Sequence, residues 1–152
     1  MNPVCSFIEF IKDLTNDEYC HNISYLPSEI YYQNGGCYEL VKTLKFFLED
    51  SQIYVKNDFG HCVLFYKGLL YDINGIVEDN QLYHLADSKD MMYLEDPLLF
   101  GRSEIKFDNL SPSEALIKNI LNCRIESLIT ECQKMDDNSD YYNKKQKIKT
   151  SL

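Results

Sequence analysis

Cations are scarce in this chain of 152 residues, and their scarcity excludes one class of partner. Fifteen Lys and Arg stand against 24 Asp and Glu, which gives a net charge of −9, and the acidic residues are spread along the sequence. A protein that binds a phosphate backbone needs a basic stripe, so we expect no nucleic-acid partner. The acidic balance would instead suit a protein partner with a basic surface.

Long apolar runs and CxxC pairs are absent from the sequence. No run approaches the ~20 apolar residues of a membrane span, so we expect no membrane partner. The N-terminus, MNPVCSFIEF, lacks the basic and apolar regions of a signal peptide, which predicts a cytoplasmic location with reduced cysteines. The pairs Cys20-His21 and His61-Cys62 are weaker candidates for zinc, because His61 and Cys62, as neighbours on a strand, point to opposite faces and cannot easily bind one ion together. We therefore predict no metal and no cofactor.

The length suits one domain, which we place at residues 1–135, followed by a polar tail at 136–152. The fold class that we predict is α+β. An antiparallel sheet of three or four strands should carry a cysteine-bearing helix from the N-terminal half and a long C-terminal helix. Residues 76–103 give no clear pattern apart from a possible helix at 86–94.

Apolar spacing and capping residues predict three principal helices. Asn2-Pro3 begins one that runs over 3–14, and a second runs from Cys37 to about 48–50. A capping box at 111–114 begins the third, which should extend to about Cys132. Strands are predicted at 51–57, 61–66 and 69–74, with a further short strand at 103–108 and a short helix at 27–31.

Two of these strands form a hairpin whose register can be worked out from the sequence. If 67–68 is a two-residue loop, residues whose numbers sum to 135 face each other. His61 then lies opposite Asn74, and Asp72 is its diagonal neighbour on the same face. Either side chain can reach an imidazole nitrogen, while a one-residue bulge would break this arrangement.

Cys37 follows a glycine pair at the start of its helix. The N-terminus of a helix carries partial positive charge and unpaired N–H groups, which favour the nucleophilic thiolate. Gly35 and Gly36 allow the backbone to approach a substrate closely. The alternative interpretation is a buried structural cysteine behind a turn.

Together, Cys37, His61 and Asp72 have the residue types of a nucleophile, a general base and an orienting acid. Each has a structural alternative, since a lone histidine on a strand is commonly structural and Asp72 would suit the turn at Asn74-Gly75. Their order along the chain and their shared face favour catalysis over these alternatives.

The segments GGCYE, FGHCV and YDING resemble the core of the papain-like and transglutaminase-like cysteine enzyme superfamily. Similar compact Cys–His–Asp domains occur among small proteins of phages and mobile elements. The resemblance covers 33–75 and implies that Cys37 is the nucleophile, His61 the general base and Asp72 the orienting residue. The chain departs from papain-like proteases at Tyr38, where they usually carry Trp.

Several groups near Cys37 are candidates for binding an oxyanion or the substrate. The oxyanion Gln of papain-like proteases lies further upstream than Gln33, which is only four residues before the cysteine. Asn34, Asn74 and the backbone N–H groups at Gly36 and Cys37 are the other candidates.

The predicted function is therefore acyl transfer through a thioester on a protein or peptide substrate. Hydrolysis, deamidation and transfer to an amine share the first half-reaction and differ in the acceptor. The alternative is a non-catalytic acidic binding or inhibitor protein that acts on a host or defence protein. The reactivity of Cys37 and its proximity to His61 distinguish the two hypotheses.

Overall fold

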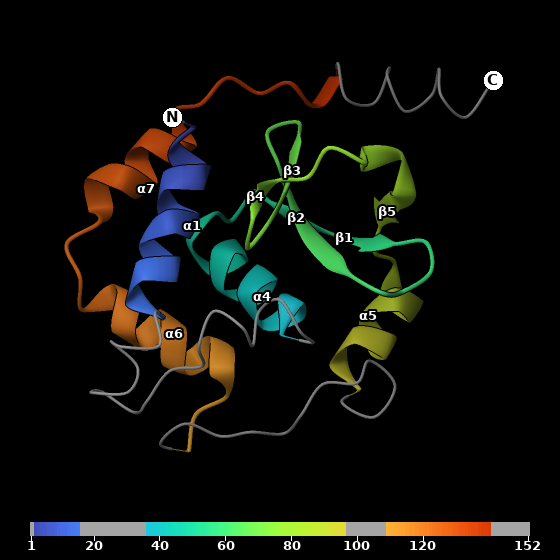
Figure 1. The fold of residues 1–152 in the computed structure, drawn as a ribbon, viewed down its shortest axis with the longest axis horizontal. Coiled ribbons are helices and arrows are strands. Elements are labelled where there is room, and N and C mark those ends of the chain that lie inside the picture. The colour runs from blue at the N-terminus through green and yellow to red at the C-terminus, as the bar shows by residue number, and fades with distance from the viewer. Residues whose placement is uncertain (1, 16–35, 97–108, 141–152) are drawn as a thin grey trace.

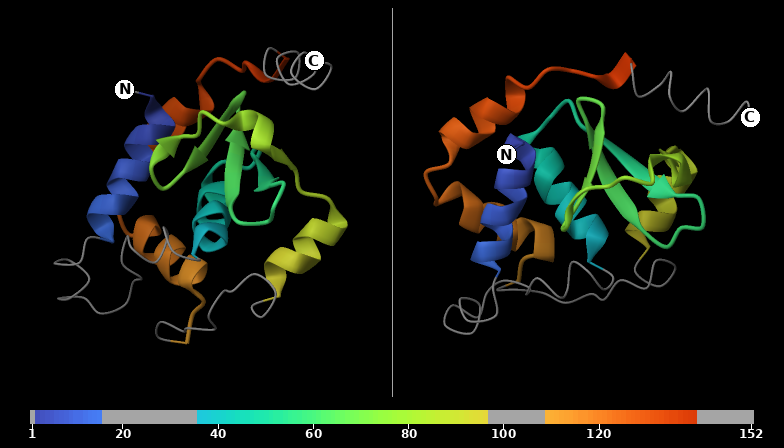
Figure 2. Two further views of the ribbon diagram at one scale, coloured as in Figure 1. Left: turned by 45° about the vertical axis from the view of Figure 1, so that its right-hand side comes forward. Right: turned by 45° about the horizontal axis from the view of Figure 1, so that its top comes forward.

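The computed structural model describes residues 2–15, 36–96 and 109–140, and it places helices beside an antiparallel sheet (Figures 1 and 2). The helices are α1 (Pro3–Leu14), α4 (Cys37–Phe47), α5 (Ser88–Glu95), α6 (Pro112–Leu121) and α7 (Glu126–Gln133). The strands are β1 (Gln52–Lys56), β2 (Cys62–Tyr66), β3 (Leu69–Asp72), β4 (Gly75–Ile76) and β5 (Tyr83–Leu85), the last preceded by the 3-10 helix η1 (Asn80–Leu82). The predicted elements at 27–31 and 103–108 lie outside the described residues.

The sheet has five strands in the order β4-β3-β2-β1-β5, so the predicted α+β class is confirmed and the predicted count of three or four strands is wrong. The two additional strands are β4 and β5, at the edges of the sheet, and they are only two and three residues long. Such short segments cannot show the alternation of polar and apolar residues that identifies a strand. They are strands because β3 and β1 supply pairing partners.

The predicted long C-terminal helix is also wrong, because the chain leaves the helix at residues 122–125 and begins another at Glu126. The capping box of Ser111 and Glu114 begins α6 as expected. The break allows the two halves to pack on different partners: α6 lies against α4, whereas α7 lies against α1. One straight helix would carry its apolar stripe past one of these partners.

The central hairpin has the register that the sequence predicts. Leu64 pairs with Tyr71, and the next pairs follow the same sum of 135. Lys67 and Gly68 have φ angles of 51° and 92°, as in the two-residue loops that match the twist of a hairpin. The hairpin therefore brings the end of β3 beside the start of β2.

Gly68 also contacts the segment that follows α7. A Cβ at this position would lie 2.5 Å from the backbone carbon of Asn138, and the N–H of Asn138 donates to the carbonyl of Lys67. Gly68→Ala is therefore expected to lower the free energy of unfolding by about 1–3 kcal/mol, measured by urea denaturation. Gly60→Ala is the matched control, because its Cβ would meet only a flexible Asp58 side chain. Equal stabilities for the two variants would contradict this packing.

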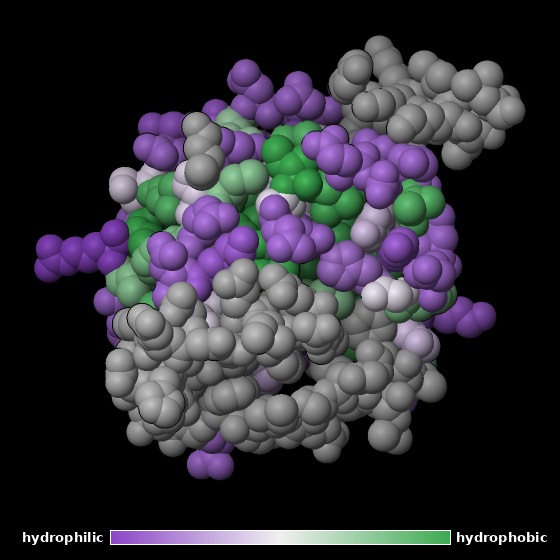
Figure 3. Space-filling model, in the orientation of Figure 1, coloured by the Kyte–Doolittle hydropathy of each residue, from purple (hydrophilic) through white to green (hydrophobic). Residues whose placement is uncertain are grey.

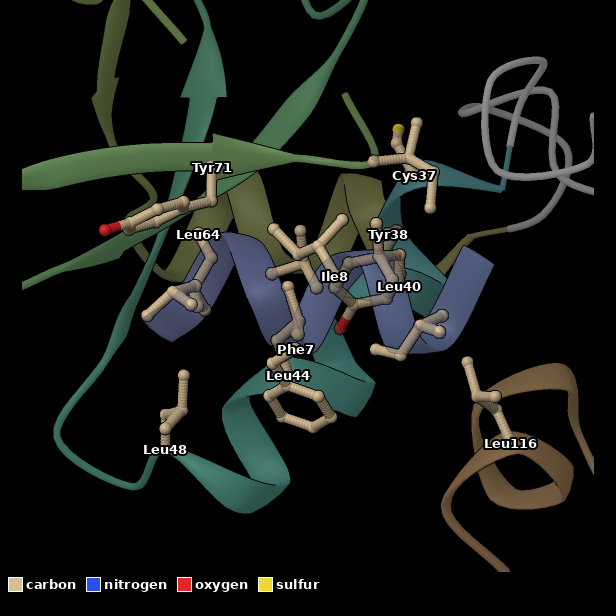
Figure 4. Close-up of a cluster of buried hydrophobic side chains, with 14 of the residues drawn as sticks. Phe7, Ile8, Cys37, Tyr38, Leu40, Leu44, Leu48, Leu64, Tyr71 and Leu116 are labelled. Carbon is tan, nitrogen blue, oxygen red and sulfur yellow. The ribbon is translucent and has the colours of Figure 1, made fainter. Parts of the chain in front are cut away.

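The main hydrophobic core lies between the sheet and the helices α1, α4, α6 and α7, and Figure 4 shows part of it. Leu64 and Tyr71 enter it from the sheet, and Phe7 and Leu44 enter it from α1 and α4. The opposite face of the sheet carries a smaller cluster, whose members are Tyr54, Val63, Phe65 and Leu70 with Val77 and Tyr83 packed on them. Polar residues cover much of the described surface seen in Figure 3.

None of the helices in the described ranges has both the length and the apolar character that crossing a bilayer requires. The longest, α1, has 12 residues and exposes polar positions such as Glu9 and Asp13. Its buried positions instead face the core, which accounts for its apolar stripe.

Candidate active site

Cys37 is the first residue of α4, directly after the N-cap residue Gly36. Its backbone N–H lies in the first turn, where no earlier helical carbonyl is available to accept it. The cysteine is 6% exposed, so little of its side chain is accessible to solvent. Gly36 has φ −94° and ψ 10°, which other residues also adopt. The backbone conformation therefore does not explain why residue 36 is a glycine.

The next two residues anchor the start of α4 to other helices. The hydroxyl of Tyr38 donates to Glu95 at the end of α5. The buried carboxylate of Glu39 accepts the N–H of Ser113 at the start of α6, at 3.1 Å. Because both partners are on separate helices, the first turn of α4 is held in place around Cys37.

His61 lies immediately before β2, and its main chain is held by the preceding turn. Its carbonyl accepts the N–H of Lys56 at 2.8 Å. Within the turn, Phe59 has a φ angle of 60°, which is uncommon for a residue with a side chain, and its ring packs against Tyr93 of α5. The turn and α5 thus fix the direction from which the imidazole enters the site.

His61 joins the acid and the thiol. Its Nε2 lies 3.0 Å from Oδ2 of Asp72, and its ring lies close enough to Cys37 to lower the pKa of the thiol. Because Nε2 is used by the carboxylate, Nδ1 is the ring nitrogen left for the sulfur. The three residues predicted from the sequence therefore lie together, with His61 between Asp72 and Cys37.

The pKa values of Cys37 and His61 favour an ion pair between the two side chains. A hydrogen bond from the thiol of Cys62, opposed by burial and helped by His61, lowers the pKa of Cys37 from 9.0 to about 5. The hydrogen bond to Asp72, with a further contribution from Cys37, raises the pKa of His61 from 6.5 to about 9. Between these two values the site holds a thiolate beside an imidazolium.

Cys62 and His61 reach the sulfur of Cys37 from different sides of the sheet. Cys62 and Leu64 face the main core with Cys37, whereas Val63 belongs to the cluster on the opposite face. Alternation along the strand would place His61 with Val63, away from α4. The imidazole still reaches Cys37 because His61 precedes the first residue of β2, and the site forms around the end of the sheet.

Cys62 is the residue of the site that the sequence did not identify. Its Sγ lies 3.7 Å from Sγ of Cys37, and it is fully buried. The sequence contained one signal for it: the strand alternation that turns His61 away from α4 turns Cys62 toward it. His84 was also missed; it bonds Asp90 of α5 and Asn57 of the turn before His61, so it supports the site indirectly.

Asn74 does not lie opposite His61, so this part of the predicted register is wrong. The chain turns back at residues 73–74, and Gly75 pairs with Asp72. The Asn74 side chain is exposed, and its backbone N–H donates to Oδ1 of Asp72 at 2.8 Å. Asp72 therefore both bonds His61 and caps the turn. Its two oxygens fit both the interpretation as a partner of His61 and the interpretation as a turn residue.

The structure describes only some of the remaining candidates for oxyanion binding. Gln33 and Asn34 lie outside them, whereas the backbone of Gly36 and Cys37 lies at the site. The ring of Tyr83, on β5, lies 6.3 Å from the ring of His61, edge to face. Across the described parts of the chain, no three His, Cys, Asp or Glu side chains are grouped to hold a metal ion.

Comparison with known families adds a classification to this geometry. The family of phage YunG-like proteins matches residues 7–110, which is more than half of the chain and includes Cys37, His61 and Asp72. The chain belongs to the phage YunG-like protein family. The match to this family ends before α6 begins. No curated protein and no solved structure matches the chain. The family's description names no reaction, so a function has to be argued from the site.

Proposed function

We propose that this YunG-like protein is a cysteine-dependent acyl-transfer enzyme with Cys37 as nucleophile, His61 as acid and base, and Asp72 as orienting residue. One observation carries the proposal: at the start of a helix, Cys37 lies beside an imidazole, His61, whose far nitrogen is 3.0 Å from a carboxylate oxygen of Asp72. A structural cysteine needs neither an imidazole nor a carboxylate behind it. A nucleophilic cysteine can be activated by an adjacent imidazole, which a carboxylate then orients.

The geometry supports a reaction in two halves. The Cys37 thiolate attacks a carbonyl carbon of the substrate and forms a C–S bond, and the C–N or C–O bond to the leaving group breaks as the His61 imidazolium gives it a proton. Neutral His61 then removes a proton from water or an amine, which attacks the thioester. The C–S bond breaks, and the thiolate and imidazolium are restored. Protein or peptide carbonyls are the substrates that we propose.

The developing oxyanion needs donors close to the nucleophile. The N–H of Cys37 is well placed because it belongs to the first turn of α4 and has no partner within the helix. The positive end of the helix dipole adds to the stabilisation of the negative charge there. We therefore assign the oxyanion site to the start of α4.

The ion pair makes a pH-dependent prediction that needs no knowledge of the substrate. Alkylation of Cys37 by iodoacetamide should rise with pH through a midpoint of about 5, because its thiolate is present above its pKa. Burial raises the pKa of Cys132 to about 11, so its alkylation in the folded protein should rise only at alkaline pH. Mass mapping of the alkylated peptides at each pH measures both.

His61 is charged below its pKa, whereas Cys37 is charged above its pKa. The His61 imidazolium is present below its pKa of about 9 and is lost as the pH rises through that value. Its ring resonances in NMR spectra should therefore titrate near 9, and turnover that needs a proton for the leaving group should fall there. A Cys37 midpoint near 9, or equal alkylation of Cys37 and Cys132 at neutral pH, would contradict the enzyme proposal.

A further inference from the structure

The sulfur of Cys37 accepts a hydrogen bond from the thiol of Cys62 at 3.7 Å. The backbone N–H of Cys62 and the side chain of His61 also lower the pKa of Cys37. Cys62 is 0% exposed and is the first residue of β2, where it packs directly beneath the start of α4. A sulfur that accepts a hydrogen bond and lies beside an imidazole is arranged to carry a negative charge.

We propose that Cys62 is a further catalytic residue, whose S–H holds the Cys37 sulfur as an oriented thiolate before the substrate arrives. The inference deepens the proposed acyl transfer and rests on it. Burial raises the pKa of Cys62 well above 9.0, so its own thiol stays protonated and remains a donor when Cys37 ionises. The two cysteines are thus divided in role, one as nucleophile and the other as donor.

The donor has a specific kinetic consequence. Each unit by which it lowers the pKa of the nucleophile raises the thiolate fraction about tenfold at pH values below the midpoint. The same unit lowers the intrinsic nucleophilicity about threefold, because nucleophilicity falls with basicity. A hydrogen bond from Cys62 therefore increases the rate at low pH and decreases it on the alkaline plateau. A residue that only fills space would not produce this crossing of the two profiles.

The test is the pH profile of Cys37 alkylation by iodoacetamide in the full chain with Cys62→Ala and Cys62→Ser. Alanine keeps the backbone N–H and removes the thiol, so the midpoint should rise by roughly one unit or more. The rate should fall about threefold per unit below the wild-type midpoint and rise about threefold per unit on the plateau. Serine keeps a donor and should recover at least half of the shift.

Cys132→Ala is the matched control, because it also truncates a fully buried cysteine but lies on α7, away from the site. It should leave the Cys37 profile unchanged. A low midpoint in the wild type that is the same in Cys62→Ala would overturn the role of Cys62 and leave the acyl-transfer proposal standing. A wild-type midpoint near 9 would remove the acyl-transfer proposal itself.

Thermal melts establish whether the Cys62 variants fold. If either variant fails to fold, the S–H stretching band of the wild type decides, measured by Raman difference spectroscopy before and after alkylation of Cys37. Loss of a hydrogen-bonded S–H band on alkylation supports the proposal. An unchanged band overturns it, because the thiol of Cys62 would then have had no bond to the Cys37 sulfur.

Discussion

Cys37→Ala is expected to abolish acylation of the protein by a chromogenic ester such as p-nitrophenyl acetate, and His61→Ala should lower it by about 10²–10⁴-fold. The first change removes the atom that forms the thioester. The second removes the imidazolium that stabilises the thiolate of Cys37 and supplies the proton for the leaving group. The measurement is the release of p-nitrophenolate, together with the mass of the acylated protein.

The two substitutions should not add. Once Cys37 is replaced, His61 has no nucleophile to activate, so the double variant should match Cys37→Ala. The control is Cys132→Ala, which removes a buried thiol far from His61 and should retain full acylation. Acylation that persists in Cys37→Ala would show that another residue reacts.

The same variant separates the enzyme from the binding hypothesis. A protein that works only by binding would retain its biological effect when Cys37 becomes alanine, because truncating a side chain that is 6% exposed changes little of the surface. Loss of the effect in a folded Cys37→Ala protein supports catalysis. The net charge of −9 is compatible with both catalysis and binding, so it does not distinguish them.

The parts of the fold that the sequence predicted are those set by local signals. The N-cap at Asn2, the capping box at Ser111 and the loop of Lys67 and Gly68 each satisfy their own backbone groups. The loop then determines the register from Leu64 to Tyr71 without any information from the rest of the chain. Asp72 could be placed beside His61 for this reason.

The parts that the sequence did not predict depend on distant partners. β5 is a strand because β1 leaves an edge for Tyr83 and Leu85 to pair with, and nothing in three residues indicates this. The break before Glu126 depends on α7 packing on α1. In the site, Cys62 was assigned only to a disfavoured zinc site, because its role depends on how α4 lies over the sheet.

The turn at Asn74 shows the same limit at closer range. Extending the pairing by arithmetic places Asn74 opposite His61, but β3 ends at Asp72 and the chain reverses into β4. The reversal is stabilised by Oδ1 of Asp72, which accepts the N–H of Asn74. One carboxylate therefore holds the turn with one oxygen and His61 with the other.

Asp72→Asn is expected to lower acylation by about 10² or more in a folded protein, although it changes only one atom. In the wild type, the Nε2–H of His61 donates to Oδ2, and Oδ1 accepts the N–H of Asn74. Asparagine has one acceptor and one donor, so keeping the turn directs its NH₂ group toward Nε2. The neutral ring must then carry its proton on Nδ1, facing the thiol that it should deprotonate.

Flipping the amide does not restore the site, because its NH₂ group would then meet the N–H of Asn74 and the turn would lose its acceptor. The substitution also removes the largest cause of the raised pKa of His61, so the NMR titration of His61 should move down from about 9 toward 6.5. Asn74→Ala is the matched control: its side chain is exposed and the backbone N–H remains, so acylation should stay within about twofold. If Asn74→Ala abolished acylation while Asp72→Asn retained it, the orienting role would pass to Asn74. A loss of acylation in Asp72→Asn without movement of the His61 titration would instead assign Asp72 to the turn alone, since a carboxylate that bonds the imidazole raises its pKa.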